Sequence, residues 1–323
     1  MLRIYTRTED KLVPFESGHV GAVPIWLDLI NPSNEDEQEV ERLLSVDVPS
    51  RADMEEIELS ARLYLEDKAA FMTLTGLANL DTDTPIKTPI TFILKNKSLV
   101  TVRYAEPKPF VAYTNRAQRP NGTPHQSGEE IMLGLIEAMI DRTADALERI
   151  GSEIDIVSHG VFKKTKAKAD KKTRDLEAVI AQIGQKAELL TMVQESLVST
   201  SRLVAYYAAI EDTSDHKESR YLVRLIQRDA TSLGEHARAL SARLDFLLNA
   251  TLGLINLEQN QIIKIFSVAA VVFLPPTLVA SAYGMNFEHM PELNWLLGYP
   301  WAIGLMMLSA LLPFLYFKRK GWL

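Results

Sequence analysis

Residues 265–287 read IFSVAAVVFLPPTLVASAYGMNF, and residues 293–317 read LNWLLGYPWAIGLMMLSALLPFLYF. Neither stretch contains a charged residue. As a helix, each would reach about 34 Å or more, enough to cross a hydrocarbon layer about 30 Å thick. Their prolines and glycines are tolerated in membrane helices. The sequence therefore predicts two membrane-spanning helices rather than two buried helices of a soluble core.

The basic residues around these spans predict their orientation. Lys264 precedes the first span, residues 318–320 (Lys-Arg-Lys) follow the second, and the connection over 284–297 has no Lys or Arg. By the positive-inside rule, both ends of the chain are cytoplasmic. The connection then lies outside with Glu288 and Glu292, which either attract cations or are ordinary solvated loop charges.

Composition excludes several classes of protein. The 323 residues include no cysteine, so disulfide scaffolds, cysteine zinc sites and thiol nucleophiles are excluded. A net charge of −7 argues against nucleic acid as a partner. The N-terminal MLRIYTRTED lacks an apolar secretory core, so we expect the N-terminal part to stay in the cytoplasm.

The region before residue 128 has mixed α and β patterning. TPITFIL (88–94) and SLVTVRY (98–104) flank Asn96 and predict a β-hairpin. Residues 31–44 predict a helix capped by Asn31 or Ser33, and residues 51–63 repeat this style. We therefore expect an α+β cytoplasmic domain, a mixed sheet with flanking helices, that ends in the loop over 118–128.

The region after residue 128 is helical in pattern, with no proline before Pro275. Three long helices are predicted, with a turn over 211–219 between the last two. The third would run from about Lys217 to Tyr283, far beyond the globular average, as a stalk packed against copies of itself. Six lysines between Lys163 and Lys172 are either a site for anionic lipid or a solvated helix end.

These patterns divide the chain into six parts. In order, we expect a cytoplasmic α/β domain (1–128), a long-helix and stalk region (129–261), a pore-lining transmembrane helix (262–283), a periplasmic loop with the Gly-Met-Asn motif (284–297), a second transmembrane helix (298–317) and a basic cytoplasmic tail (318–323).

One face of the first span predicts a pore lining. Residues at an average spacing of about 3.7, close to the helical period, form what we call the stripe: Asn260, Ile263, Ser267, Ala270, Leu274, Thr277, Ser281 and Asn286. Its two large apolar members could act as constrictions that gate by dewetting. Its Ser and Thr members fit ordinary helix packing equally well. Pro275-Pro276 is either a hinge or a tolerated bend.

The loop and the chain end carry a family resemblance. Residues 283–288 (YGMNFE), 290–293 (MPEL), 316–323 (YFKRKGWL) and 255–281 together resemble the CorA family of magnesium transporters, in its enterobacterial branch. The resemblance implies an inner-membrane homopentamer with one central pore and a ring of Asn286 at its outer mouth. It also implies Mg²⁺ as substrate and cytoplasmic regulator, Co²⁺ and Ni²⁺ as secondary substrates, and no organic cofactor.

The chemistry of Mg²⁺ explains this motif. Mg²⁺ gives up its water reluctantly, so a pore does better to bind the hydrated ion through neutral oxygens. Asn286 offers an outer-sphere acceptor, and the carbonyls of Gly284 and Met285 offer more at a helix end. One chain with two spans cannot enclose a channel, so several copies are required.

The regulatory site stays unassigned. In relatives, carboxylates between subunits bind cytoplasmic Mg²⁺ and close the channel, but the position of one sensing Asp is here Asn249. A zinc transporter on the same scaffold is an alternative, although Met285 favours the magnesium branch. A membrane-anchored scaffold or sensor would not need Asn260 and Asn286. An enzyme lacks support, because no nucleotide-binding glycine loop or catalytic constellation occurs.

Overall fold

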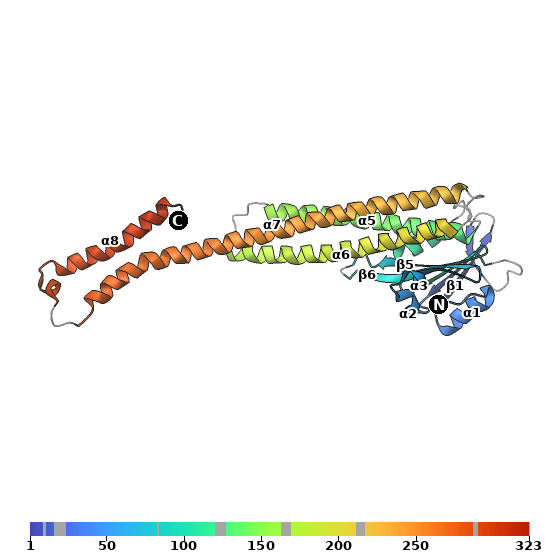
Figure 1. The fold of residues 1–323 in the computed structure, drawn as a ribbon, viewed down its shortest axis with the longest axis horizontal. Helices are drawn as coiled ribbons and strands as arrows, with labels where there is room; N and C mark the ends of the chain where they lie inside the picture. Colours follow the sequence, from blue (N-terminus) through green and yellow to red (C-terminus); the bar gives the residue numbers. More distant parts are fainter. Residues whose placement is uncertain are drawn as a thin grey trace. The chain divides into compact units, whose positions relative to one another are not determined.

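The computed structural model in Figure 1 describes residues 1–8, 11–15, 24–82, 84–119, 127–162, 169–210, 217–286 and 290–322. Sheet strands and short helices fill the first third of the chain, and long helices follow. The strands are β1 (Leu2–Thr8), β2 (Lys11–Pro14), β3 (Trp26–Ile30), β4 (Leu63–Glu66), β5 (Ala69–Ala78), β6 (Ile86–Lys95) and β7 (Ser98–Arg103). The shorter helices are α1 (Asn34–Leu44), α2 (Arg51–Glu55), α3 (Leu59–Arg62) and α4 (Lys108–Ala117).

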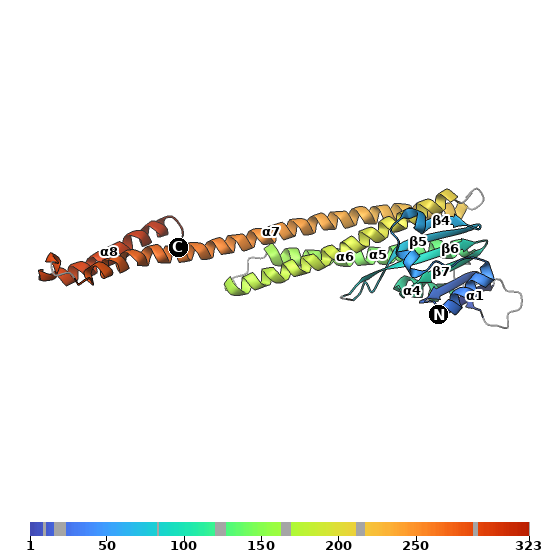
Figure 2. The same cartoon turned by 60° about the horizontal axis from the view of Figure 1, so that its bottom comes forward.

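One mixed sheet contains all seven strands, in the order β2-β1-β3-β7-β6-β5-β4. Figure 2 shows β4 to β7 side by side. Every pairing is antiparallel except that of β3 with β7, in which Asp28 lies beside Thr101. The predicted β6–β7 hairpin is confirmed, with Lys95 opposite Ser98 and Asn96 at a φ of 56°. Asn tolerates this left-handed conformation better than most residues.

Side chains alternate between the two faces of the sheet, and both faces are buried. One face packs its β3, β5, β6 and β7 residues against α1 and α2, through residues such as Leu29, Val40 and Met54. The other face carries aromatic residues against α4, where the rings of Phe92 and Phe110 stack at 6.4 Å. The sheet is therefore the middle layer of a three-layer domain, as expected for a mixed sheet with flanking helices.

The first predicted helix is confirmed, whereas the second is wrong as one element. Ser33 caps α1 by accepting a hydrogen bond from the Asp36 backbone N–H. Residues 51–63 instead form α2 and α3, separated at Glu56, whose ψ of 144° is not helical. Leu63 then starts β4 opposite Met72. The hydrogen bonds of this edge strand replace those that a continued helix would have made.

A buried ion pair lies at the parallel junction. Asp28 and Arg103 are 2% and 1% exposed, and Asp28 Oδ2 accepts from Arg103 at 2.7 Å. Thr101 donates to Asp28 Oδ1 at 2.7 Å, and Trp26 donates to the Thr101 hydroxyl at 3.0 Å. Arg103 also lies 4.6 Å from the centre of the Phe110 ring. Because each charge is neutralised and hydrogen-bonded, this network fixes how β3 and β7 pair.

The long helices are α5 (Gly128–Phe162), α6 (Ala169–Ile210), α7 (Lys217–Tyr283) and α8 (Gly298–Arg319), with a short 3₁₀ helix η1 at Pro291–Asn294. The predicted continuity of residues 217–283 is confirmed. The segments over 211–216 and 120–126 lie outside the described residues, as does most of the lysine run, at 163–168.

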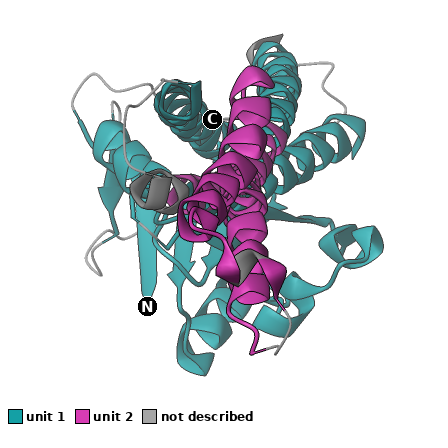
Figure 3. Ribbon diagram, turned by 90° about the vertical axis from the view of Figure 1, so that its left-hand side faces the viewer, with its two compact units in different colours: residues 1–162, 181–247 teal, residues 163–180, 248–323 magenta. Residues whose placement is uncertain are grey.

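Two compact units divide these helices, as coloured in Figure 3. Unit 1 comprises residues 1–162 and 181–247, and unit 2 comprises 163–180 and 248–323. In unit 1 the helices form a bundle, in which Gln194 of α6 donates to Ser241 of α7 at 3.0 Å and Phe162 of α5 stacks on Phe246 of α7.

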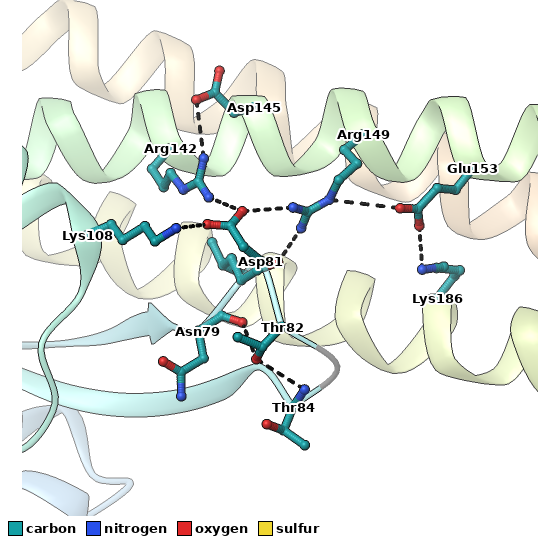
Figure 4. A network of polar contacts seen from close by, with 11 residues as sticks. Asn79, Asp81, Thr82, Thr84, Lys108, Arg142, Asp145, Arg149, Glu153 and Lys186 are labelled. Atoms are coloured by element: carbon teal, nitrogen blue, oxygen red, sulfur yellow. Dashed lines mark hydrogen bonds and ion pairs between the residues drawn. The ribbon is translucent and has the colours of Figure 1, made fainter.

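A polar cluster joins the turn after β5 to α5, as Figure 4 shows. The Asp81 carboxylate contacts Lys108, Arg142 and Arg149, the last at 2.8 Å. Arg149 also donates to the Leu80 carbonyl. These three cations hold the pKa of Asp81 well below its usual range. The turn is therefore held to the helix bundle of unit 1 by charge as well as by packing.

Removal of the buried carboxylate should destabilise the sheet strongly. Asp28→Ala leaves Arg103 buried without its partner, so we expect a loss of about 3–5 kcal/mol in unfolding free energy. Urea unfolding of the full chain in detergent, followed by tryptophan fluorescence, measures this. Glu106→Ala is the matched control, because Glu106 pairs with Arg3 at an exposed site and should cost under about 1 kcal/mol. Equal losses of unfolding free energy in Asp28→Ala and Glu106→Ala would contradict the stabilising role of the buried ion pair.

The Asp81 cluster should make stability depend on pH. The pKa of Asp81 is lower in the folded protein than its unfolded value of about 3.9, so the charged carboxylate stabilises the fold at pH values above about 3.9. This contribution is lost as the pH falls below that value. At pH 7, Asp81→Asn should therefore lower the melting temperature, through a loss of about 1 kcal/mol. In thermal melts, the difference in melting temperature between the wild type and Asp81→Asn should become smaller as the pH is lowered from about 5 to about 3. A gap that stays constant over this range would show that the charge of Asp81 does not stabilise the fold.

Candidate ion-conducting site

Two helices of the structure are long and apolar enough to cross a membrane, α7 and α8. Only 6% of the most apolar window of each helix is buried within the chain. Their large apolar residues face outward, for example Phe273 at 70% and Leu278 at 71% exposed. Exposed apolar surface of this extent needs lipid or other protein to cover it.

The stripe is wholly uncovered. Its seven members within α7 are exposed, including Ile263 at 61% and Leu274 at 73%, and Asn286 beyond the helix is exposed as well. The structure therefore places the residues from Asn260 to Ser281 along one continuous face of a single helix. Glu288 lies outside the described residues, and the backbone of Glu292 lies in η1.

The opposite side of the same helix is the covered one. Val268 is buried at 3% exposure, and Val272, Pro275, Val279 and Tyr283 are half-buried. At about 100° per residue, these five positions centre on the side directly opposite the stripe. The chain thus covers one side of its own first span and leaves the stripe side free.

The end of α8 lies close to the start of this apolar segment. Lys264 lies 5.8 Å from the centre of the Trp322 ring, and Trp322 stacks on Phe317 at 5.3 Å. An ammonium over an indole face is a favourable cation–π geometry. This contact joins the start of the first span to the chain that follows the second span, and basic residues lie at both places.

The two prolines open the backbone of α7 without ending the helix. Pro275 and Pro276 have no N–H, so the carbonyls of Val271 and Val272 lose their usual helical donors. Thr277 donates its hydroxyl to the Phe273 carbonyl at 2.8 Å. Its oxygen keeps lone pairs that can accept a hydrogen bond from water. The middle of the span therefore offers oxygen acceptors but no charge.

The helix ends at the Gly-Met-Asn motif. Gly284 donates its backbone N–H to Ala280 at 2.9 Å, and Met285 donates to Ala282 at 3.4 Å. No described residue donates a hydrogen bond to the carbonyls of Gly284 and Met285 or to the Asn286 amide. Within the described residues, these neutral oxygens therefore have no hydrogen-bond donor at the end of the stripe, where the helix dipole is negative.

A preformed metal cage is absent from the described residues: no group of three or more His, Asp or Glu side chains could hold an ion. Asn249, at the position of the sensing carboxylate expected from the resemblance, is exposed on α7. Carboxylates contributed by separate copies would not meet in one chain. The regulatory site therefore stays unassigned.

Comparison with known proteins agrees with this architecture. Residues 21–319 match the family model described as CorA-like Mg2+ transporter protein. The chain belongs to this family. Proteins named magnesium transport protein CorA are 36% identical over 303 residues in Escherichia coli K12 and 35% identical over 299 residues in Pasteurella multocida Pm70, each covering 93% of this chain and 92% of the relative.

The fold also matches a solved relative along its whole length. The complete structure of the CorA magnesium transporter from Methanocaldococcus jannaschii superposes with a TM-score of 0.79 at 16% identity, covering 100% of this chain and 99% of that one. The family match confirms the resemblance found in the sequence, and the match to the solved structure confirms the predicted fold class. The chain is a membrane protein with two transmembrane helices, of a transporter family and not an enzyme family.

Cysteine labelling tests which side of α7 faces water. The chain has no cysteine, so Thr277→Cys and Val279→Cys each introduce a single thiol. We expect a charged, water-soluble methanethiosulfonate to modify Thr277→Cys on the stripe at least about tenfold faster than Val279→Cys on the covered side, because only a hydrated path admits a charged reagent. Equal rates, or faster reaction of Val279→Cys, would contradict the assignment of the stripe.

Proposed function

We propose that this chain forms a passive, gated channel for Mg²⁺ influx, with Co²⁺ and Ni²⁺ as secondary substrates. The observation that carries the proposal is the uncovered stripe of α7, which ends at a set of free neutral oxygens around Asn286. Relatives at 35–36% identity bear the name of magnesium transport proteins. The apolar and neutral character of the stripe suits an ion that keeps its water shell.

Selection takes place at Gly284, Met285 and Asn286. A hydrated Mg²⁺ presents water hydrogens outward, and these need acceptors rather than direct ligands. The Asn286 amide oxygen and the carbonyls of Gly284 and Met285 supply such acceptors without a fixed charge. A carboxylate in the same place would favour stripping of the shell. Asn286 thus binds the ion through its water, while Glu288 and Glu292 raise the cation concentration outside.

The pore requires several copies, and we infer a homopentamer within the lipid bilayer. One helix face cannot enclose water, so the stripe becomes a pore only when copies surround one axis. The exposure of all its members in a single chain agrees with such an arrangement. Five copies would place five Asn286 amides in a ring, as the family resemblance implies.

Gating would use the two bulky members of the stripe. Ile263 and Leu274 are 61% and 73% exposed, and rings of such side chains can exclude water when they approach one another. Cytoplasmic Mg²⁺ is the proposed closing signal, and its site would lie between copies. The other members of the stripe between Asn260 and Ser281 would stay in contact with water, because their side chains are small or polar.

The orientation follows from charge. Lys264 and the basic tail over 318–320 lie at one end of the two spans, and by the positive-inside rule this supports cytoplasmic termini and a 284–297 loop outside, across a cell inner membrane. The exposed aromatics Trp295, Tyr299 and Trp301 would then lie at the outer interface.

Complementation of a magnesium-auxotrophic bacterium tests this function. We expect the wild-type chain to restore growth in low Mg²⁺ and to support Mg²⁺ uptake. Asn286→Ala should reduce uptake at least about tenfold, because the lost acceptor is worth about 1.5–3 kcal/mol to a charged, hydrated ion. Asn294→Ala, an exposed amide of the same loop, is the matched control and should retain uptake.

The outcome separates magnesium from zinc transport. If the wild-type chain fails to restore growth while it supports zinc uptake, the magnesium assignment is wrong. If Asn286→Ala and Asn294→Ala reduce uptake equally, the motif does not select the ion.

A further inference from the structure

A cleft in unit 1 lies far along the chain from the membrane spans. Its volume is about 560 Å³, within the range of small-molecule sites. Its walls come from α2, α3, β4, β5, β6 and the part of α6 in unit 1; α3, β5, β6 and α6 are labelled in Figure 1. On α6, Glu195, Val198, Ser199 and Arg202 line it. Their spacing of three and four residues places them on one face of that helix.

The charges in this cleft do not cancel. Its two carboxylates have their own cations, since Glu195 pairs with Lys87 at 2.6 Å and Glu55 pairs with Arg51 at 2.9 Å. Arg62 and Arg202 also line the cleft. Neither forms an ion pair with any described residue. The lining residues therefore carry one positive charge in excess, and both guanidinium groups lack an ion-pair partner among the described residues.

Hydrogen-bonding groups hold this cleft in shape. Arg62 donates to the Thr75 hydroxyl at 3.1 Å and to the Glu56 carbonyl, which keeps its guanidinium at the wall. Ser199 accepts from the Thr75 backbone N–H at 2.9 Å, which ties α6 to β5. Thr73 lies against the Thr91 hydroxyl at 2.7 Å and lines the same space. Arg62 still has donors to spare, because a guanidinium carries five N–H groups.

Exposed apolar side chains complete the cleft. Ile57, Leu59 and Val198 line it and are 92%, 50% and 41% exposed. A free inorganic anion would leave these side chains in water. A ligand with a flat apolar part beside its charged group would cover them. The cleft thus combines the two features that organic phosphate ligands require, unpaired guanidiniums and apolar surface.

We propose that this cleft binds an organic phosphate monoester of nucleotide size. The phosphate would lie against Arg62 and Arg202, and the organic part would cover the apolar side chains of α3 and α6. Guanidinium groups match phosphate oxygens in a bidentate geometry, which makes them better suited than lysine to this contact. The site lies entirely within unit 1 and does not depend on ion conduction.

Calorimetric titration of the full chain in detergent, in Mg²⁺-free buffer, tests the proposal with AMP as the probe. We expect AMP to bind, and adenosine and inorganic phosphate each to bind at least about tenfold more weakly, because each keeps only one part of the ligand. Arg202→Gln should weaken AMP at least about tenfold, while the matched control Arg238→Gln, also exposed on a helix of unit 1 and without a described ion pair, should leave the affinity unchanged.

Arg202→Gln is the decisive variant. The Arg202 side chain has no hydrogen-bond or ion-pair partner among the described residues, so the variant should have the melting temperature of the wild type. Absence of AMP binding, equal binding of adenosine, or equal weakening by Arg238→Gln would overturn the proposal. So would loss of the oligomer in Arg202→Gln by native mass measurement, since the cleft would then be filled by a second copy. None of these readouts uses ion uptake, so failure here leaves the transport proposal standing.

Discussion

The hydrocarbon layer of the membrane is the constraint on which the rest of this molecule depends. It offers no partners to charges or to unpaired backbone groups, so a segment that crosses it as a helix must be largely apolar. α7 satisfies this requirement over its last turns, and under the proposed function it also offers oxygen acceptors to a hydrated divalent ion. The groups available for this are the neutral members of the stripe and the helix end at Gly284. The span therefore offers only neutral, dipolar groups and no charged ones.

The asymmetry of α7 follows from the same constraint. Val268 and its neighbours at helical spacing are covered by the chain itself, while the stripe on the other side is exposed. A monomer would leave Asn260, Ser267 and Thr277 facing lipid, where polar groups without partners are costly. In the proposed oligomer, assembly around a common axis would place these groups against water instead. Oligomerisation and conduction are in this sense one requirement.

Unit 1, in contrast, uses charge inside its fold, and there the charges are paired. Asp28 and Arg103 neutralise each other inside the sheet, and Asp81 is surrounded by three cations at the turn after β5. Arg62 and Arg202 line one cleft, and neither forms an ion pair with a described residue.

The sequence by itself determined the features that depend on neighbours along the chain. Two uncharged runs predicted the spans, and the residues around Asn96 predicted the hairpin turn. Asn31 or Ser33 was predicted as a helix cap, and an unbroken periodicity predicted the length of α7. Tertiary structure alone decided which strands pair, because the parallel contact of Asp28 with Arg103 joins residues far apart. It also split residues 51–63, where pairing of Leu63 with β5 outweighs helix propensity. The Arg62–Arg202 cleft left no local signal, since residues on α3 and α6 meet only when the sheet and the bundle pack together.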